Sequence, residues 1–248
     1  MTIKTKKIQQ RFDAASHSYD SVAHIQKQCA ERLTNQLTTK WPDFSPFSVL
    51  DLGTGTGYLP ELLLPMFPTC PFTLNDLSPR MLERAQEKIS HYPHVQCQLG
   101  DMETTVFAFH DLIVSNLALQ WMIHVESALR AFYLNSNVMA FTCLLDGTFQ
   151  EWEHLFQTHH APSPVQSYPS SSQLERFLLS LNPSEHSFTI QDFQMTFQGA
   201  QSFMIYLKQL GASFSQTNVS FTQVRQLIQT PPQAFDVTYR VFFGILKR

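Results

Sequence analysis

The sequence lacks the features that mark membrane-spanning and secreted proteins. It has no run of 18 apolar residues, and its first dozen residues, MTIKTKKIQQRF, contain no apolar stretch of the kind found in a signal peptide. Its four cysteines, Cys29, Cys70, Cys97 and Cys143, form no C-x-x-C pair of the kind seen in zinc sites. We therefore expect a cytoplasmic protein that holds reduced thiols in its core, contacts no membrane and binds no metal.

Charge is also scarce, and neither sign dominates. Charged residues make up 15% of the chain and the net charge is −3, whereas a nucleic-acid-binding protein usually has a basic excess, so we expect no nucleic-acid partner. Hydrophobic residues make up 43%, which excludes a disordered chain. Basic residues gather at the two ends, at Lys4, Lys6, Lys7, Arg11, Lys247 and Arg248. They suit either solvated termini or a docking surface for an acidic partner.

Short apolar runs alternate with helix-spaced stripes along the first 150 residues. The runs at 48–53, 72–77, 95–100, 111–116 and 138–144 predict buried strands. Stripes at 58–67, 81–89 and about 119–134 predict helices that pack on a sheet. Repeated strand–helix steps favour an α/β fold with a Rossmann-like, mostly parallel sheet and helices on both faces.

The two ends of the chain have a different pattern. Residues 1–40 have helical spacing, and residues 188–198 and 238–246 predict two late strands, which brings the sheet to seven. We expect a single domain over 1–248. Within it, 1–40 form an N-terminal helical lid segment, 41–148 form a cofactor-binding core, and 149–248 hold the remaining sheet with a helical insertion at about 200–230.

A glycine-rich loop is the strongest chemical motif. The run DLGTGTG places Asp51, Gly53, Gly55 and Gly57 directly after a strand and at the start of a helix. Glycines there allow the backbone to approach a ligand closely, and a helix N-terminus offers unpaired N–H groups. Asp76 ends the next strand, where a carboxylate can accept hydrogen bonds from both hydroxyls of a ribose.

Two nucleoside cofactors compete for such a loop. The dinucleotide fingerprint is G-x-G-x-x-G, whereas this loop is G-x-G-x-G and is preceded by an acid. The Asp51 carboxylate would repel a pyrophosphate but can attract the ammonium of a methionine moiety; alternatively it only structures the loop. Either way the sequence favours S-adenosylmethionine, with S-adenosylhomocysteine as its product.

Polar residues follow the next two strands as well. Asp101 can accept a hydrogen bond from an adenine amino group while Met102 packs on the ring, and Asn116 and Leu117 follow the fourth strand. Ligands of open α/β sheets bind at this carboxyl edge. Thr54 and Leu77, which neighbour the residues above, complete the predicted cofactor-binding set.

Longer runs carry a family resemblance over nearly the whole chain. They are FDAASHSYDSVAHIQKQCAERL at 12–33, VLDLGTGTGYL, NDLSPRML, GDMETTVF, SNLALQWM at 115–122, YLKQLGA at 206–212 and VTYRVFFG at 237–244. Together they resemble the malonyl-acyl-carrier-protein O-methyltransferases of biotin synthesis, which are class I methyltransferases. The first run and N-L-A-L-Q-W are the most specific. Thr54 stands where that family usually has cysteine.

The resemblance implies a reaction and a few acceptor-side residues. A methyl group would pass to the free carboxylate of malonyl-acyl-carrier protein, or of malonyl-CoA. That carboxyl has a pKa of about 4, so it is ionised at neutral pH and needs no general base. The resemblance implies catalytic roles for Tyr19 as a hydrogen-bond donor and Trp121 as a pocket wall. Arg240 and Lys208, in the late runs, are either partners of the carboxylate or surface charges.

Two other functions remain open from the sequence. A related small-molecule methyltransferase, such as one that methylates a quinone ring carbon, would need a base for its nucleophile. A methyltransferase-like binding module without turnover is the alternative from another class. The intact glycine loop, Asp76 and Asp101 argue against the module, because a degenerate protein is expected to lose cofactor residues.

Overall fold

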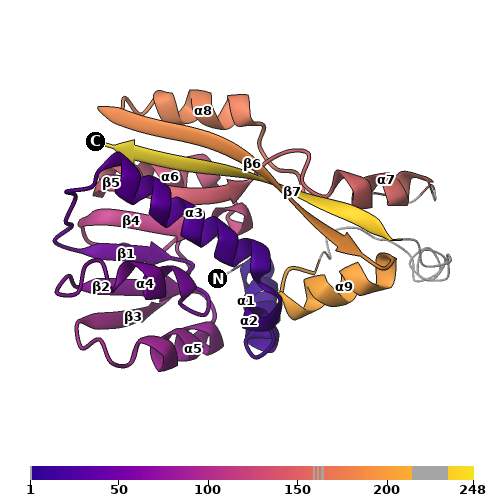
Figure 1. Ribbon diagram of the computed structural model, residues 1–248, viewed down its shortest axis with the longest axis horizontal. Helices are drawn as coiled ribbons and strands as arrows, with labels where there is room; N and C mark the ends of the chain where they lie inside the picture. Colours follow the sequence, from indigo (N-terminus) through magenta and orange to yellow (C-terminus); the bar gives the residue numbers. More distant parts are fainter. Residues whose placement is uncertain (1, 159, 161, 163–164, 214–233) are drawn as a thin grey trace.

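The computed structural model describes residues 2–158, 160, 162, 165–213 and 234–248 (Figure 1). Seven strands form one sheet in the order β3-β2-β1-β4-β5-β7-β6. Strands β1 to β5 run parallel, and β7 is antiparallel to both of its neighbours. The strands are β1 (Val49–Leu52), β2 (Phe72–Asp76), β3 (Val95–Leu99), β4 (His110–Asn116), β5 (Ser136–Leu144), β6 (Glu185–Phe197) and β7 (Phe235–Lys247). The predicted fold is confirmed.

Helices cover both faces of the sheet, as expected. On one face α3 (His24–Lys40), α4 (Tyr58–Leu63), α5 (Pro79–Ile89), α7 (Gln150–Thr158) and α9 (Ala200–Gln209) share an apolar core with the inward side chains of the strands. On the other face α6 (Val125–Leu134) and α8 (Ser171–Leu179) bury a second core. Every residue of β1 and β2 is buried, because a central parallel strand is covered on both sides.

Local chemistry explains where the helices begin. The Ser78 hydroxyl accepts a hydrogen bond from the Met81 N–H at 3.1 Å, and Pro79 follows at the first helical position of α5. The helix expected at 119–134 is instead divided into a short 3₁₀ turn, η1 (Leu119–Trp121), and α6. The Glu103 carboxylate accepts hydrogen bonds from the N–H groups of Ile123 and His124, which starts a new helix there.

The N-terminal segment is helical throughout, as expected. It consists of α1 (Ile3–Ala15), the single turn α2 (Tyr19–Val22) and α3. Figure 1 shows α1 and α2 beside α9, and α1 also contacts α5. This arrangement places α1 and α2 across the end of the sheet at which the parallel strands finish. The domain limits at residues 40 and 148 remain predictions.

Two expectations from the sequence need correction, and a third concerns residues that lie partly outside the described chain. The thiol of Cys97 is exposed, because β3 is the edge strand, whereas Cys29, Cys70 and Cys143 are buried. The late strands extend over 13 residues each, beyond the predicted bounds, since they pair with each other from Glu185–Lys247 to Phe197–Phe235. Of the insertion expected at 200–230, α9 is observed and 214–233 lie outside the described residues. No helix of the described chain is long and apolar enough to cross a membrane.

Gly244 in β7 offers a test of packing. A Cβ atom there would lie 2.8 Å from Cζ of Phe141, the residue opposite it in β5. We expect Gly244→Ala to lower the free energy of unfolding by about 1–3 kcal/mol, because the added methyl overpacks the sheet face. Phe141→Leu should relieve part of this loss in the double variant. Urea denaturation measures both effects, and an unchanged Gly244→Ala protein or strict additivity would contradict the packing.

Candidate functional site

Two adjoining pockets lie at the carboxyl ends of β1, β2, β3 and β4. Gly53, Gly55, Asn116 and Tyr19 line both, so the pockets form one crevice. The larger pocket also contains Asp76, Leu77, Asp101, Met102, Leu117 and Trp121. The smaller one contains Asp51 and Thr54. The structure therefore brings together all the predicted cofactor-binding residues except Gly57, together with Tyr19 and Trp121.

The backbone of the glycine loop has positive φ angles, which residues other than glycine rarely adopt. Gly53, Gly55 and Gly57 have φ angles of 68°, 57° and 82°. A Cβ atom on Gly53 would lie 2.4 Å from the Cβ of Ala118, so only glycine lets this loop pass the turn after β4. A Cβ on Gly57 would lie 2.9 Å from the Cβ of Ala85 in α5. Gly57 thus allows α4 and α5 to pack closely and does not line the crevice.

Asp76 lies at the end of β2, as its motif predicted, and is nearly fully buried. One carboxylate oxygen accepts the N–H of Gly55 at 2.8 Å and the other accepts the N–H of Ser78 at 2.8 Å. Burial raises the pKa of this carboxyl to about 6 in spite of these two bonds. A carboxylate has about four acceptor positions, so acceptor capacity remains for a ligand that donates hydrogen bonds.

The smaller pocket contains polar atoms that lack partners. Asp51 Oδ2 and Gln26 Oε1 are buried and find no hydrogen-bond partner among the described residues, while the buried Thr54 hydroxyl lies close to the Asp51 carboxyl. Burial raises the pKa of Asp51 to about 7. Nearly all buried polar groups in folded proteins are paired, so the unpaired acceptors of Asp51 and Gln26 around one pocket indicate a ligand with N–H or O–H groups. Lys27 lines the same pocket and adds a cation.

The turn after β4 carries backbone strain. Leu117 has a φ of 48°, an uncommon value for a residue with a branched side chain, and its N–H donates to Thr142 Oγ1 at 2.8 Å. The Asn116 amide donates to the carbonyl of Gln26 in α3 at 2.9 Å. These bonds fix the turn against both the sheet and the N-terminal segment, which is how strained backbone persists at a site.

Aromatic and apolar side chains cover the larger pocket. Thr5, Ile8 and Phe12 of α1 line it, and the Phe12 ring meets the Trp121 ring edge to face at 5.4 Å between centroids. Tyr19 is half-buried between the two pockets, and burial raises the pKa of its hydroxyl above the ordinary value of 10. Its hydroxyl therefore stays protonated and can act only as a neutral donor or acceptor.

The two cations considered as partners of the substrate carboxylate are surface charges, the alternative that the sequence also allowed. Arg240 is exposed, and its Nε lies 3.9 Å from the Asp192 carboxylate on the neighbouring strand β6. Lys208 is exposed on α9. Neither lines the crevice. A motif places a residue in the sequence, but the strand or helix face decides where its side chain points.

Sequence reasoning also missed residues that the structure assigns to the crevice. They are Phe12, Gln26, Lys27, Asn75 and Glu103. The first three belong to the run at 12–33, so the signal was present but only Tyr19 was taken from it. Glu103 follows Asp101 by two residues, and its bonds to the start of α6 join the β3–β4 loop to the turn that carries Trp121.

Comparison with known proteins agrees with this architecture. A family model described as a methyltransferase domain matches residues 49–135. The solved structure of the plantazolicin methyltransferase BpumL with S-adenosylhomocysteine superposes with a TM-score of 0.51 at 15% identity, covering 99% of this chain and 98% of that one. The YcgJ protein of Bacillus subtilis gives a TM-score of 0.59 at 15% identity, covering 88% and 99%. At these identities the likeness extends to the fold alone.

Sequence relatives are closer. The malonyl-[acyl-carrier protein] O-methyltransferase of Neorickettsia risticii is 38% identical over 96% of this chain and 94% of its own length. The protein of the same name from Priestia megaterium is 31% identical over 86% of this chain and 83% of its own. Such identity over nearly the full length of both chains is beyond what a shared fold produces. The chain belongs to the malonyl-[acyl-carrier protein] O-methyltransferase family.

Proposed function

We propose that this methyltransferase transfers a methyl group from S-adenosylmethionine to the free carboxylate of malonyl-acyl-carrier protein. The products are a malonyl methyl ester and S-adenosylhomocysteine. One observation carries the proposal: the crevice places unpaired buried acceptors at one end and an edge-to-face pair of aromatic rings at the other. The names of the relatives support the acceptor, and malonyl-CoA is the same chemical group on a smaller thiol.

The residues present suit the proposed cofactor. The remaining acceptor capacity of Asp76 suits the hydroxyls of a ribose, and Asp101 with Met102 match the polar edge and the face of adenine. Asp51 and Gln26 would accept from the ammonium, while Lys27 would pair with the carboxylate of the amino-acid end. Thr54, Leu77, Asn116 and Leu117 form the walls between these groups. When bound, the cofactor supplies a methyl group on a positively charged sulfur.

The chain's contribution is positioning and exclusion of water. The acceptor carboxylate is already an anion, so no residue has to remove a proton. Opposite charges are neutralised as the methyl group moves, and a dry pocket favours that change. Phe12 and Trp121 keep water out, and the neutral Tyr19 hydroxyl would orient the carboxylate or the methionine end of the cofactor.

The N-terminal helix is also suited to receive an acidic carrier protein. Together α1 and α5 hold seven basic and three acidic residues, although the whole chain has a net charge of −3. We propose Lys4, Lys6 and Lys7 as docking residues, since α1 forms one wall of the crevice. Arg248 does not join them. Its guanidinium donates to the Leu134 carbonyl, and its backbone N–H donates to the Asn137 carbonyl at the start of β5, so it lies at the opposite end of the strands from the crevice.

An assay with methyl-labelled S-adenosylmethionine tests the acceptor. We expect label on malonyl-acyl-carrier protein and, with a higher KM, on malonyl-CoA, because the coenzyme lacks the carrier's acidic surface. Acetyl-carrier protein is the matched control, since it has no free carboxylate. Added salt should raise the KM for the carrier more than that for malonyl-CoA. Methylation of acetyl-carrier protein, or of a quinone ring with neither malonyl thioester labelled, would refute the proposal.

The buried carboxyls predict a pH-dependent affinity for S-adenosylhomocysteine. With the pKa of Asp76 at about 6 and that of Asp51 at about 7, acid protonates both groups and removes acceptors. We expect affinity to fall as pH drops from about 8 to about 5, by up to roughly tenfold per unit for each carboxyl. Asp76→Asn should bind weakly and lose its share of this dependence.

Titration calorimetry across this range measures the effect, and equal wild-type affinity at both ends would contradict it.

The stability of the unliganded protein should change with pH in the opposite sense. Both carboxyls hold protons more tightly in the folded state than in the unfolded chain. Their contribution to stability is therefore full in acid and is lost as pH rises through the raised pKa values.

Tyr19→Phe deletes one hydroxyl and keeps the ring. We expect kcat to fall roughly tenfold to hundredfold, because an unpaired buried polar partner costs about 1–3 kcal/mol. The pH profile should not move, since this hydroxyl stays protonated over the working range. Tyr92→Phe, after α5 and outside the crevice, is the control. Steady-state rates that match wild type in Tyr19→Phe would exclude the role.

A further inference from the structure

The segment that carries Tyr19 has little structure of its own. Helix α2 (Tyr19–Val22) is four residues long and has no buried residue. Ser18, which precedes it, makes no side-chain hydrogen bond that would cap the helix. Helix formation is costly to start, so a single turn does not hold itself. Yet Tyr19 reaches between both pockets of the crevice. Contacts from outside α2 must therefore fix its position.

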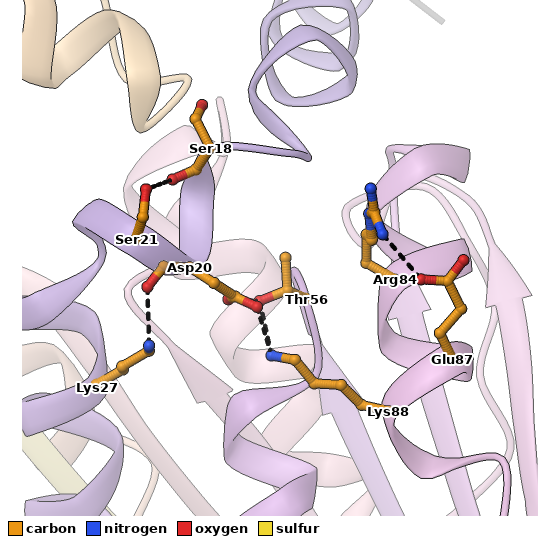
Figure 2. A network of polar contacts seen from close by, with 8 residues as sticks. All are labelled: Ser18, Asp20, Ser21, Lys27, Thr56, Arg84, Glu87 and Lys88. Atoms are coloured by element: carbon orange, nitrogen blue, oxygen red, sulfur yellow. Dashed lines mark hydrogen bonds and ion pairs between the residues drawn. The ribbon is translucent and has the colours of Figure 1, made fainter.

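Asp20 makes three of those contacts (Figure 2). One carboxylate oxygen accepts the Thr56 hydroxyl at 2.5 Å, and the other lies 2.8 Å from the Lys88 ammonium. The backbone carbonyl of Asp20 accepts a hydrogen bond from Lys27 at 2.8 Å. Thr56 belongs to the glycine loop, Lys88 to the last turn of α5 and Lys27 to α3. One residue thus joins α2 to three separate elements.

The Asp20 carboxylate is charged when it makes these contacts. Burial alone would raise the pKa of this carboxyl, but the hydrogen bonds from Lys88 and Thr56 outweigh it and lower the pKa below its ordinary value. The Asp20 and Lys88 side chains are 41% and 26% exposed, so the ion pair adds little to overall stability. Its effect is on position rather than on folding.

The contact with Thr56 also reaches the proposed ribose site. Thr56 is 2% exposed and directly follows Gly55, whose N–H donates to Asp76 at 2.8 Å. Gly55 thus bonds Asp76, the carboxylate that would bind the cofactor. The next residue, Thr56, bonds Asp20, the carboxylate that holds α2. Because Gly55 and Thr56 are consecutive residues, we expect a movement of the Asp20 carboxylate to act on the Asp76 carboxylate as well.

We propose that Asp20 is a positioning residue: it fastens α2 to the glycine loop and α5, holds Tyr19 across the crevice, and must release Thr56 and Lys88 before the bound cofactor product can leave. This inference rests on the proposed function, since it takes the crevice as the cofactor site. It gives Asp20 and Lys88 a role in the release of the cofactor product. This role is separate from cofactor binding by the glycine loop and from methyl transfer to the acceptor.

The dissociation rate of S-adenosylhomocysteine tests the fastening in the full-length protein. Asp20→Asn keeps an acceptor for Thr56 but removes the ion pair, and Asp20→Ala removes both contacts. We expect dissociation to be roughly threefold to tenfold faster in Asp20→Asn and faster still in Asp20→Ala, as expected for losing one and then two partly buried polar contacts. We expect kcat to fall as well, because Tyr19 is less well placed.

Substitutions on α5 supply a partner and a control. Lys88→Met should match Asp20→Asn, and adding it to Asp20→Asn should change little more, because both remove the same pair. Glu87→Gln breaks the exposed pair with Arg84, 3.0 Å long and one residue away from Lys88 (Figure 2), and should leave the rate unchanged. Lys88→Met also covers the case in which an Asp20 variant fails to fold.

Stopped-flow displacement separates fastening from a merely structural role. A structural role would lower Tm and the active fraction but leave the dissociation rate of the folded fraction as in wild type. Wild-type dissociation rates in both Asp20→Asn and Lys88→Met would overturn the inference while leaving the proposed function intact. Failure of the wild-type protein to bind S-adenosylhomocysteine would instead refute the proposed function, and the inference with it.

Discussion

The two hydrogen bonds received by the Asp76 carboxylate determine how the parts of the crevice meet. The Gly55 N–H brings the glycine loop to the end of β2, and the Ser78 N–H fixes the first turn of α5. The Ser78 hydroxyl donates in turn to Asp13 of α1 at 2.5 Å. Loop, strand, helix and cover therefore depend on one buried carboxylate. A change of charge or position at Asp76 acts on all of them together.

Burying such a group is unfavourable unless it is paired, and this crevice leaves several acceptors incompletely paired. The pKa values of Asp51 and Asp76 are raised for the same reason, because burial disfavours the charged form of each carboxyl. A ligand rich in N–H and O–H groups removes that penalty when it binds. The binding surface is thus built from polar groups that folding alone leaves without full hydrogen bonding, which is typical of a preorganised site.

Much of this was predictable where the signal is local. The strands, the N-cap at Ser78, the glycine loop and Asp76 follow from patterns that span a few residues, because periodicity and capping act over one or two turns. Glu103 and Asp20 were not identified, since their partners are 20 and 36 residues away in sequence. The places of Arg240, Lys208 and Arg248 could not be decided from the sequence for a related reason: a charge carries no information about the side of a fold on which it lies.

The order of the sheet has a consequence for biosynthesis. Strand β7 is the last of the seven in the chain, yet it lies inside the sheet between β5 and β6. Until its 13 residues have left the ribosome, β6 has no strand to pair with and the outer edge of β5 stays open. Open strand edges attract other chains. The nascent polypeptide therefore carries an unfinished sheet until β7 has emerged, and this is the stage at which chaperones are most useful to it.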